Sequence, residues 1–162
     1  MPFVFRGMFK VSLLAPLPKD EETSVVVEAV FTHFLKPYPA KIAQSEKQQI
    51  LYTGSLYFYS PYNVKTQKSI VKLASSTIES HTKQKPFSVS DNVITYGPYK
   101  DTSPLQSQEL KIHFENNSPF LIVNDMLRWI EVSHWGNVAV EESYNMKHQG
   151  AELKVGLYTY FF

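Results

Sequence analysis

Residues 109–115 read Glu-Leu-Lys-Ile-His-Phe-Glu, and this stretch decides the fold class of the chain. Apolar and polar side chains alternate along it, which places three apolar side chains on one side: Leu110, Ile112 and Phe114. Successive side chains of a β-strand point to opposite faces of its sheet. The stretch is therefore predicted to be a strand with one buried face and one solvated face.

Similar strand-like segments recur along the chain, separated by turn residues. The segments expected to form strands are 25–35, 49–53, 56–59, 69–74, 77–82, 93–96, 109–115, 120–123, 126–132 and 138–142. Gly54-Ser55 suits a tight hairpin turn, Gly97-Pro98 is expected to be a turn, and 83–92 reads as a polar loop. No stretch keeps a helical period over a dozen residues. The sequence thus predicts an all-β fold, an antiparallel β-sandwich-like domain with little helix.

Composition narrows the classes of function. The chain has 162 residues, of which 43% are hydrophobic and 14% aromatic, so it can bury a core without metals or cross-links. Its net charge is +1 and its basic residues are not clustered, which argues against nucleic-acid binding. It contains no cysteine, which excludes disulfides, iron–sulfur clusters, thiolate zinc sites and cysteine nucleophiles. No apolar run reaches the roughly 18 residues expected of a membrane span.

A search for catalytic motifs finds none. The five histidines do not show the spacing of a helical metal site, and neither a phosphate-binding glycine loop nor a Gly-x-Ser-x-Gly motif occurs. Glu141 and Glu142 are adjacent, so on a strand they would point to opposite faces and could not act as an acid–base pair. We therefore expect no catalytic residue, no metal and no cofactor.

Three surface features allow two interpretations each. The aromatic run 57–62 could stack on sugars, or it could pack with Phe58 in the core while Tyr57 and Tyr59 share the other face. Asn116 begins an Asn-Asn-Ser glycosylation sequon, but Pro119 directly after it disfavours use of the acceptor. Trp135, beside a glycine, could anchor a corner of the fold or serve as an interface anchor for a partner.

Several ordered stretches of the chain resemble one known family. The most specific of them are Glu115-Asn116-Asn117-Ser118-Pro119-Phe120-Leu121, Ile130-Glu131-Val132-Ser133-His134-Trp135-Gly136-Asn137, Tyr57-Phe58-Tyr59-Ser60-Pro61-Tyr62 and Lys147-His148-Gln149-Gly150-Ala151. In these stretches and their order, the chain resembles the ribophorin I family, which is subunit 1 of the dolichyl-diphosphooligosaccharide–protein glycosyltransferase of the endoplasmic reticulum. The resemblance covers residues 25–154, the β-rich region. Residues 1–24, which are expected to include an initial strand, match poorly and residues 155–162 diverge, which leads us to expect a truncated lumenal region.

The resemblance implies a role without catalysis. The complex transfers a preassembled oligosaccharide from dolichyl diphosphate to Asn in Asn-x-Ser/Thr sequons, and the family supplies an accessory subunit of it. The implied partners are other subunits of this complex, including the catalytic one, and nascent polypeptide substrates. The implied location is the lumenal side of the endoplasmic reticulum membrane, with membrane attachment through family segments that this chain lacks. From the residues alone, the alternative is a free-standing β-sandwich that binds glycans.

Overall fold

The computed structural model describes residues 11–13, 15–32 and 34–154, and no helix occurs among them. Accordingly, this part of the chain offers no helix with the length and apolar character needed to cross a membrane. The strands in it are β1 (Leu35–Pro37), β2 (Lys41–Ile42), β3 (Gln49–Ser55), β4 (Val64–Lys72), β5 (Ile78–His81), β6 (Phe87–Ser90), β7 (Val93–Thr102), β8 (Glu109–Glu115), β9 (Leu121–Val132), β10 (Val138–His148) and β11 (Glu152–Leu153). The predicted all-β fold is confirmed.

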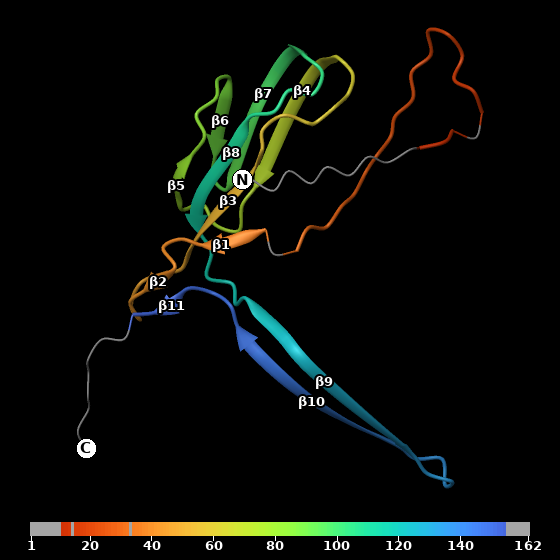
Figure 1. Cartoon of the computed structure of the whole chain (residues 1–162), viewed down its shortest axis with the longest axis vertical. Helices are drawn as coiled ribbons and strands as arrows, with labels where there is room; N and C mark the ends of the chain where they lie inside the picture. The colour runs from red at the N-terminus through yellow and green to blue at the C-terminus, as the bar shows by residue number, and fades with distance from the viewer. Residues whose placement is uncertain (1–10, 14, 33, 155–162) are drawn as a thin grey trace.

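Two antiparallel sheets pack together to form the body of the molecule (Figure 1). One has the strand order β1-β3-β8-β5 and the other β4-β7-β6. A single cluster of buried side chains joins them: Ile50, Leu56, Tyr57, Leu73, Ile94, Tyr96, Tyr99, Leu110, Ile112 and Phe114. Because both sheets contribute to one cluster, the arrangement is a β-sandwich.

The alternating stretch 109–115 is strand β8, as predicted, and it lies inside its sheet. It pairs with β3 on one side and with β5 on the other. Leu110, Ile112 and Phe114 are all buried, with Ile112 completely enclosed, while Lys111 is exposed. The period of two thus gives the buried face of this strand correctly.

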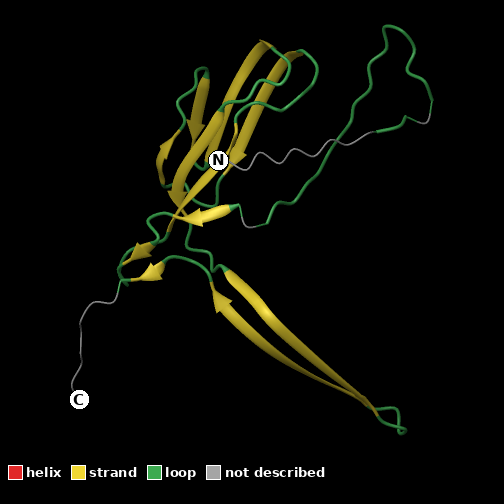
Figure 2. Ribbon diagram, in the orientation of Figure 1, coloured by secondary structure: helices red, strands yellow, loops and turns green. Residues whose placement is uncertain are grey.

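Two further pairs of strands extend the molecule beyond the sandwich (Figure 2). β9 and β10 form a long antiparallel hairpin that projects away from both sheets, and β2 and β11 form a short parallel pair near its base. The predicted strands 120–123 and 126–132 are one continuous strand, β9, which contains a register shift opposite Asn145/Met146.

The prediction of a long strand over residues 25–35 is wrong for nearly all of its length. β1 begins only at Leu35, and the described residues before it are not in a strand. They run away from the two sheets (red to orange in Figure 1), and Val26 and Val30 are 91% and 87% exposed. β-branched residues favour a strand only when a neighbouring strand pairs with them, and here none does.

The two predicted turns are also wrong. Gly54 lies within β3, and Leu56 leaves the sheet instead of returning as a hairpin strand. Gly97 lies within β7, opposite a register shift in β4. It has a φ of 97°, and a Cβ there would lie 2.7 Å from the carbonyl oxygen of Gln67. Glycine is thus needed for a bulge inside a long strand rather than for a turn at its end. The polar loop expected at 83–92 contains β6, which pairs with β7.

Candidate functional site

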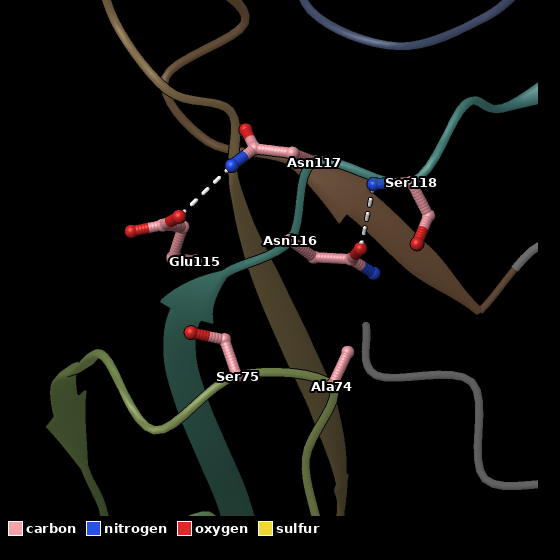
Figure 3. Close-up of a pocket in the computed structure, with 6 residues that line it drawn as sticks. All are labelled: Ala74, Ser75, Glu115, Asn116, Asn117 and Ser118. Carbon is pink, nitrogen blue, oxygen red and sulfur yellow. Dashed lines mark hydrogen bonds between the residues drawn. The ribbon is translucent and has the colours of Figure 1, made fainter.

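The predicted residue Asn116 lies at the end of β8, where the sandwich meets the β9–β10 hairpin. A hollow of about 370 Å³ opens there, lined by Ala74, Ser75, Glu115, Asn116, Asn117 and Ser118 (Figure 3). The loop after β4 contributes one wall, and the segment that leaves β8 contributes the other. The hollow is polar, so it is a place for hydrogen bonds rather than for an apolar ligand.

The backbone and the side-chain oxygen of Asn116 are held by hydrogen bonds. Its backbone N–H donates to the carbonyl of Gln48 (3.0 Å), and its own carbonyl accepts from the Gln48 side-chain amide (2.9 Å). Its Oδ1 accepts from the backbone N–H of Ser118 (2.9 Å). The residue is only 8% exposed. An attached glycan needs an accessible side-chain nitrogen, so this burial disfavours modification of Asn116 in the folded chain; the acceptor role stays a prediction.

Gln48 is the central residue of this junction, and sequence reasoning missed it. Besides its two bonds to Asn116, its backbone N–H donates to Asn117 Oδ1 (2.9 Å) and its side-chain Oε1 accepts from the N–H of Ala151 (2.8 Å). One buried glutamine thus links β3, the end of β8 and the segment before β11. A polar residue directly before a strand gives no signal of this role, because all its partners are distant in sequence.

Charged groups at the hollow are paired. Glu115 forms an ion pair with Lys47 (3.0 Å) and accepts a hydrogen bond from the Asn117 side-chain amide (2.8 Å). Among the residues that line the hollow there is no histidine or lysine that could serve as a base for Ser75 or Ser118. Nor do His, Asp and Glu side chains of the described chain gather into a possible metal site. The arrangement can position backbone segments through its hydrogen bonds and its ion pair.

The short β2–β11 pair joins the segment that follows the β9–β10 hairpin to β2 and to the loop after it. Lys41 and Lys154 form ion pairs with Glu152 (3.3 Å) and Glu46 (3.6 Å), respectively. The backbone N–H of Ala43 and then the charge of Lys154 hold the pKa of Glu46 below its ordinary value. These groups are exposed, so their role is to set geometry more than to add stability.

The other predicted site residue, Trp135, lies in the turn between β9 and β10, and this hairpin projects away from the two sheets (Figure 1). Trp135 is 91% exposed, so it does not anchor a corner of the described fold. A role as an interface anchor stays a prediction.

The aromatic run 57–62 is arranged differently from the predicted core packing. Tyr57 is buried and its ring packs on Tyr99 with centroids 5.3 Å apart, whereas Phe58 is 74% exposed. The prediction that Phe58 enters the core is therefore wrong. The residues leave the sheet after Ser55, so the alternation of a strand does not apply to them.

Comparisons with known proteins agree on one family. A family model described as Ribophorin I matches residues 6–157. The chain is 40% identical over 148 residues to dolichyl-diphosphooligosaccharide–protein glycosyltransferase subunit 1B of Arabidopsis thaliana, covering 91% of this chain and 32% of that relative. It is also 40% identical over 153 residues to subunit 1 of the same enzyme from Caenorhabditis elegans, covering 91% and 25%. The chain spans between a quarter and a third of the length of these relatives.

Proposed function

The chain belongs to the ribophorin I family, and from that premise we propose that it forms part of a non-catalytic accessory subunit of oligosaccharyltransferase. In this role it supports the complex that transfers a preassembled oligosaccharide from dolichyl diphosphate to asparagine in Asn-x-Ser/Thr sequons. The observation that carries the proposal is the match to the family over residues 6–157, almost the whole chain.

The chemistry of the junction supports a role without catalysis. Its polar groups bond to backbone segments and to one another: Gln48 to the segment after β8 and to Ala151 before β11, and Glu115 to Lys47 and Asn117. Among the described residues, no buried side-chain nitrogen or oxygen lacks a hydrogen-bond partner. Groups used in this way hold backbone segments together, as a structural subunit requires.

The proposed partners are the other subunits of the complex, the catalytic one included, and nascent polypeptides that receive the oligosaccharide. The proposed place is the lumenal side of the endoplasmic reticulum membrane. The exposed Trp135 at the hairpin tip is proposed as an interface anchor, because a large aromatic side chain contributes strongly once a partner buries it.

Purification from microsomes tests the proposal. The parent protein that contains this chain is tagged, the microsomes are solubilised in mild detergent, and the tagged protein is recovered. We expect the catalytic subunit of oligosaccharyltransferase to be recovered with it in a constant ratio through a second sizing step. Recovery of the tagged protein apart from the complex would refute the assignment.

Glycan binding is a second candidate because aromatic rings stand free on the loop after β3. Phe58 and Tyr62 are 74% and 76% exposed. Such rings can stack on the apolar faces of sugars. Calorimetric titration with oligomannose tests this function, and Phe58→Ala together with Tyr62→Ala should abolish any heat of binding. Absence of binding at millimolar sugar would remove this candidate.

A further inference from the structure

One face of the β9–β10 hairpin is largely apolar, and its other residues are Arg128, Glu142 and His148. The register pairs Val132 with Val138 and Ile130 with Val140, and facing residues of an antiparallel pair lie on the same side. We call this side the apolar face; its apolar members are Leu121, Val123, Met126, Ile130, Val132, Val138, Val140, Tyr144 and Met146. Each of them is between 43% and 71% exposed. The described residues therefore leave uncovered a stripe that runs the length of the hairpin.

A β-bulge keeps this stripe continuous. Asp125 pairs with Asn145 and Val123 pairs with Met146, so Asn124 is an extra residue without a partner. The β9 residues of the apolar face occupy even positions after Asn124 and odd positions before it. Without the extra residue, Val123 and Leu121 would turn to the opposite face. The sequence and the bulge together favour one uninterrupted apolar face, as expected of a surface that is buried in use.

The chemistry of the two faces indicates what covers the apolar one. Its single charged pair, Arg128 and Glu142, is joined at 2.6 Å, and the Tyr144 hydroxyl donates to the same carboxylate. The charge is thus neutralised within the hairpin, so the cover needs no complementary charge. The opposite face is mixed: it carries the polar Asp125, Glu131, Glu141 and Lys147, but also the apolar Ile122, Leu127 and Trp129. The hairpin thus has one predominantly apolar face and one mixed face, and an antiparallel sheet packs its more apolar face on a core.

A second copy of the chain fits this face poorly. Eleven residue pairs at about 3.4 Å each make a ribbon about 37 Å long, and a two-stranded ribbon is about 10 Å wide, which gives roughly 370 Å² for each partner. Such a strip is only two strands wide, whereas separate chains in stable complexes meet over broad patches. A layer from the same polypeptide needs less area, because it loses no translational freedom on packing.

We propose that the apolar face is the inner wall of a second core, covered by an uncharged apolar layer from the part of the family polypeptide outside the matched stretch. The relatives hold that material, since this chain spans 32% of the Arabidopsis protein. A two-stranded hairpin is marginal in water, so the hairpin gains its stability from this layer. The proposal rests on family membership and not on the role in oligosaccharyltransferase.

The absence of cysteine from the chain allows a direct test. A single thiol is introduced on the apolar face by Val140→Cys or, as the matched control one residue away on the opposite face, by Glu141→Cys. Each variant is made in this chain alone and in the full-length Arabidopsis relative with its matched stretch replaced by this chain. After digestion, mass spectrometry follows the rate at which the peptide that contains the introduced cysteine is alkylated.

We expect alkylation of Val140→Cys to be at least about tenfold slower in the full-length protein than in the chain alone, as for a site reached only by local opening. Glu141→Cys should react at similar rates in both. Equal rates for Val140→Cys would overturn the proposal. Protection in the chain alone that is lost on dilution would instead assign the face to a second copy, and protection that requires phosphatidylcholine vesicles would assign it to a membrane. Each result is independent of the co-purification of the parent protein with the glycosyltransferase.

Discussion

Replacing Ile112 by alanine should destabilise the sandwich more than any change on the outer face of the same strand. Ile112 is completely buried in the cluster that joins the two sheets. The substitution removes three carbon atoms, worth about 2.4 kcal/mol at ~0.8 kcal/mol each. Incomplete closure of the cavity raises the expected loss to about 3–4 kcal/mol.

The matched control is the neighbouring His113→Ala on the opposite face. His113 is half-buried, and its Nε2 lies 2.8 Å from the carbonyl oxygen of Tyr38. The loss of one such hydrogen bond costs about 0.5–1.5 kcal/mol. The structure thus gives His113 a partner that its place on the polar face of the sequence pattern does not reveal.

Urea unfolding followed by circular dichroism measures both losses. With a denaturant dependence of about 1–3 kcal/mol per molar, a loss of about 3 kcal/mol lowers the Ile112→Ala midpoint by about 1–3 M. The midpoint of His113→Ala should fall by less than half as much. Equal shifts, or a larger shift for His113→Ala, would mean that the buried face of β8 is assigned incorrectly.

Three further predictions concern other parts of the sandwich and its junction. Burial, and then the nearby Tyr99 phenol, raises the pKa of Tyr96 to about 12. Because the phenol ionises near pH 10 in the unfolded chain, the free energy of unfolding should be highest below pH 10 and should fall by about 2–3 kcal/mol between pH 10 and 12. Melting curves at these pH values check this, and Tyr96→Phe should flatten the dependence. Gly97→Ala should destabilise the fold by more than the roughly 1 kcal/mol of backbone strain expected for Gly136→Ala. A Cβ at Gly97 meets backbone atoms, whereas one at Gly136 meets no atom within 4 Å. Equal losses of stability in thermal melts would contradict this. Gln48→Ala should lower the free energy of unfolding by about 1–3 kcal/mol, because it leaves buried partners unpaired. It should also speed hydrogen exchange at the backbone N–H of Ala151, which donates to Gln48 Oε1, and unchanged exchange there by NMR would refute the linking role.

The fold class and the buried face of strand β8 could be predicted from the amino-acid sequence. Alternation in 109–115 depends on the geometry of one strand, in which neighbouring side chains point to opposite sides, so it needs no knowledge of the rest of the chain. The ordered stretches around Asn116 and Trp135 likewise predicted the family, which the comparisons confirm. Local pattern and local identity are both carried by contiguous residues.

Tertiary structure decided the features that depend on distant partners. Residues 25–32 have a strand-like composition, but a strand needs a neighbouring strand, and the described residues of this segment belong to no sheet. Gly97 is predicted as a turn residue from its sequence, whereas its close approach to Gln67 makes it a bulge within β7. Gln48 links segments that are 68 and 103 residues away. Such contacts arise only when the whole chain has folded, because hydrogen-bond partners are selected by proximity in space and not by order in sequence.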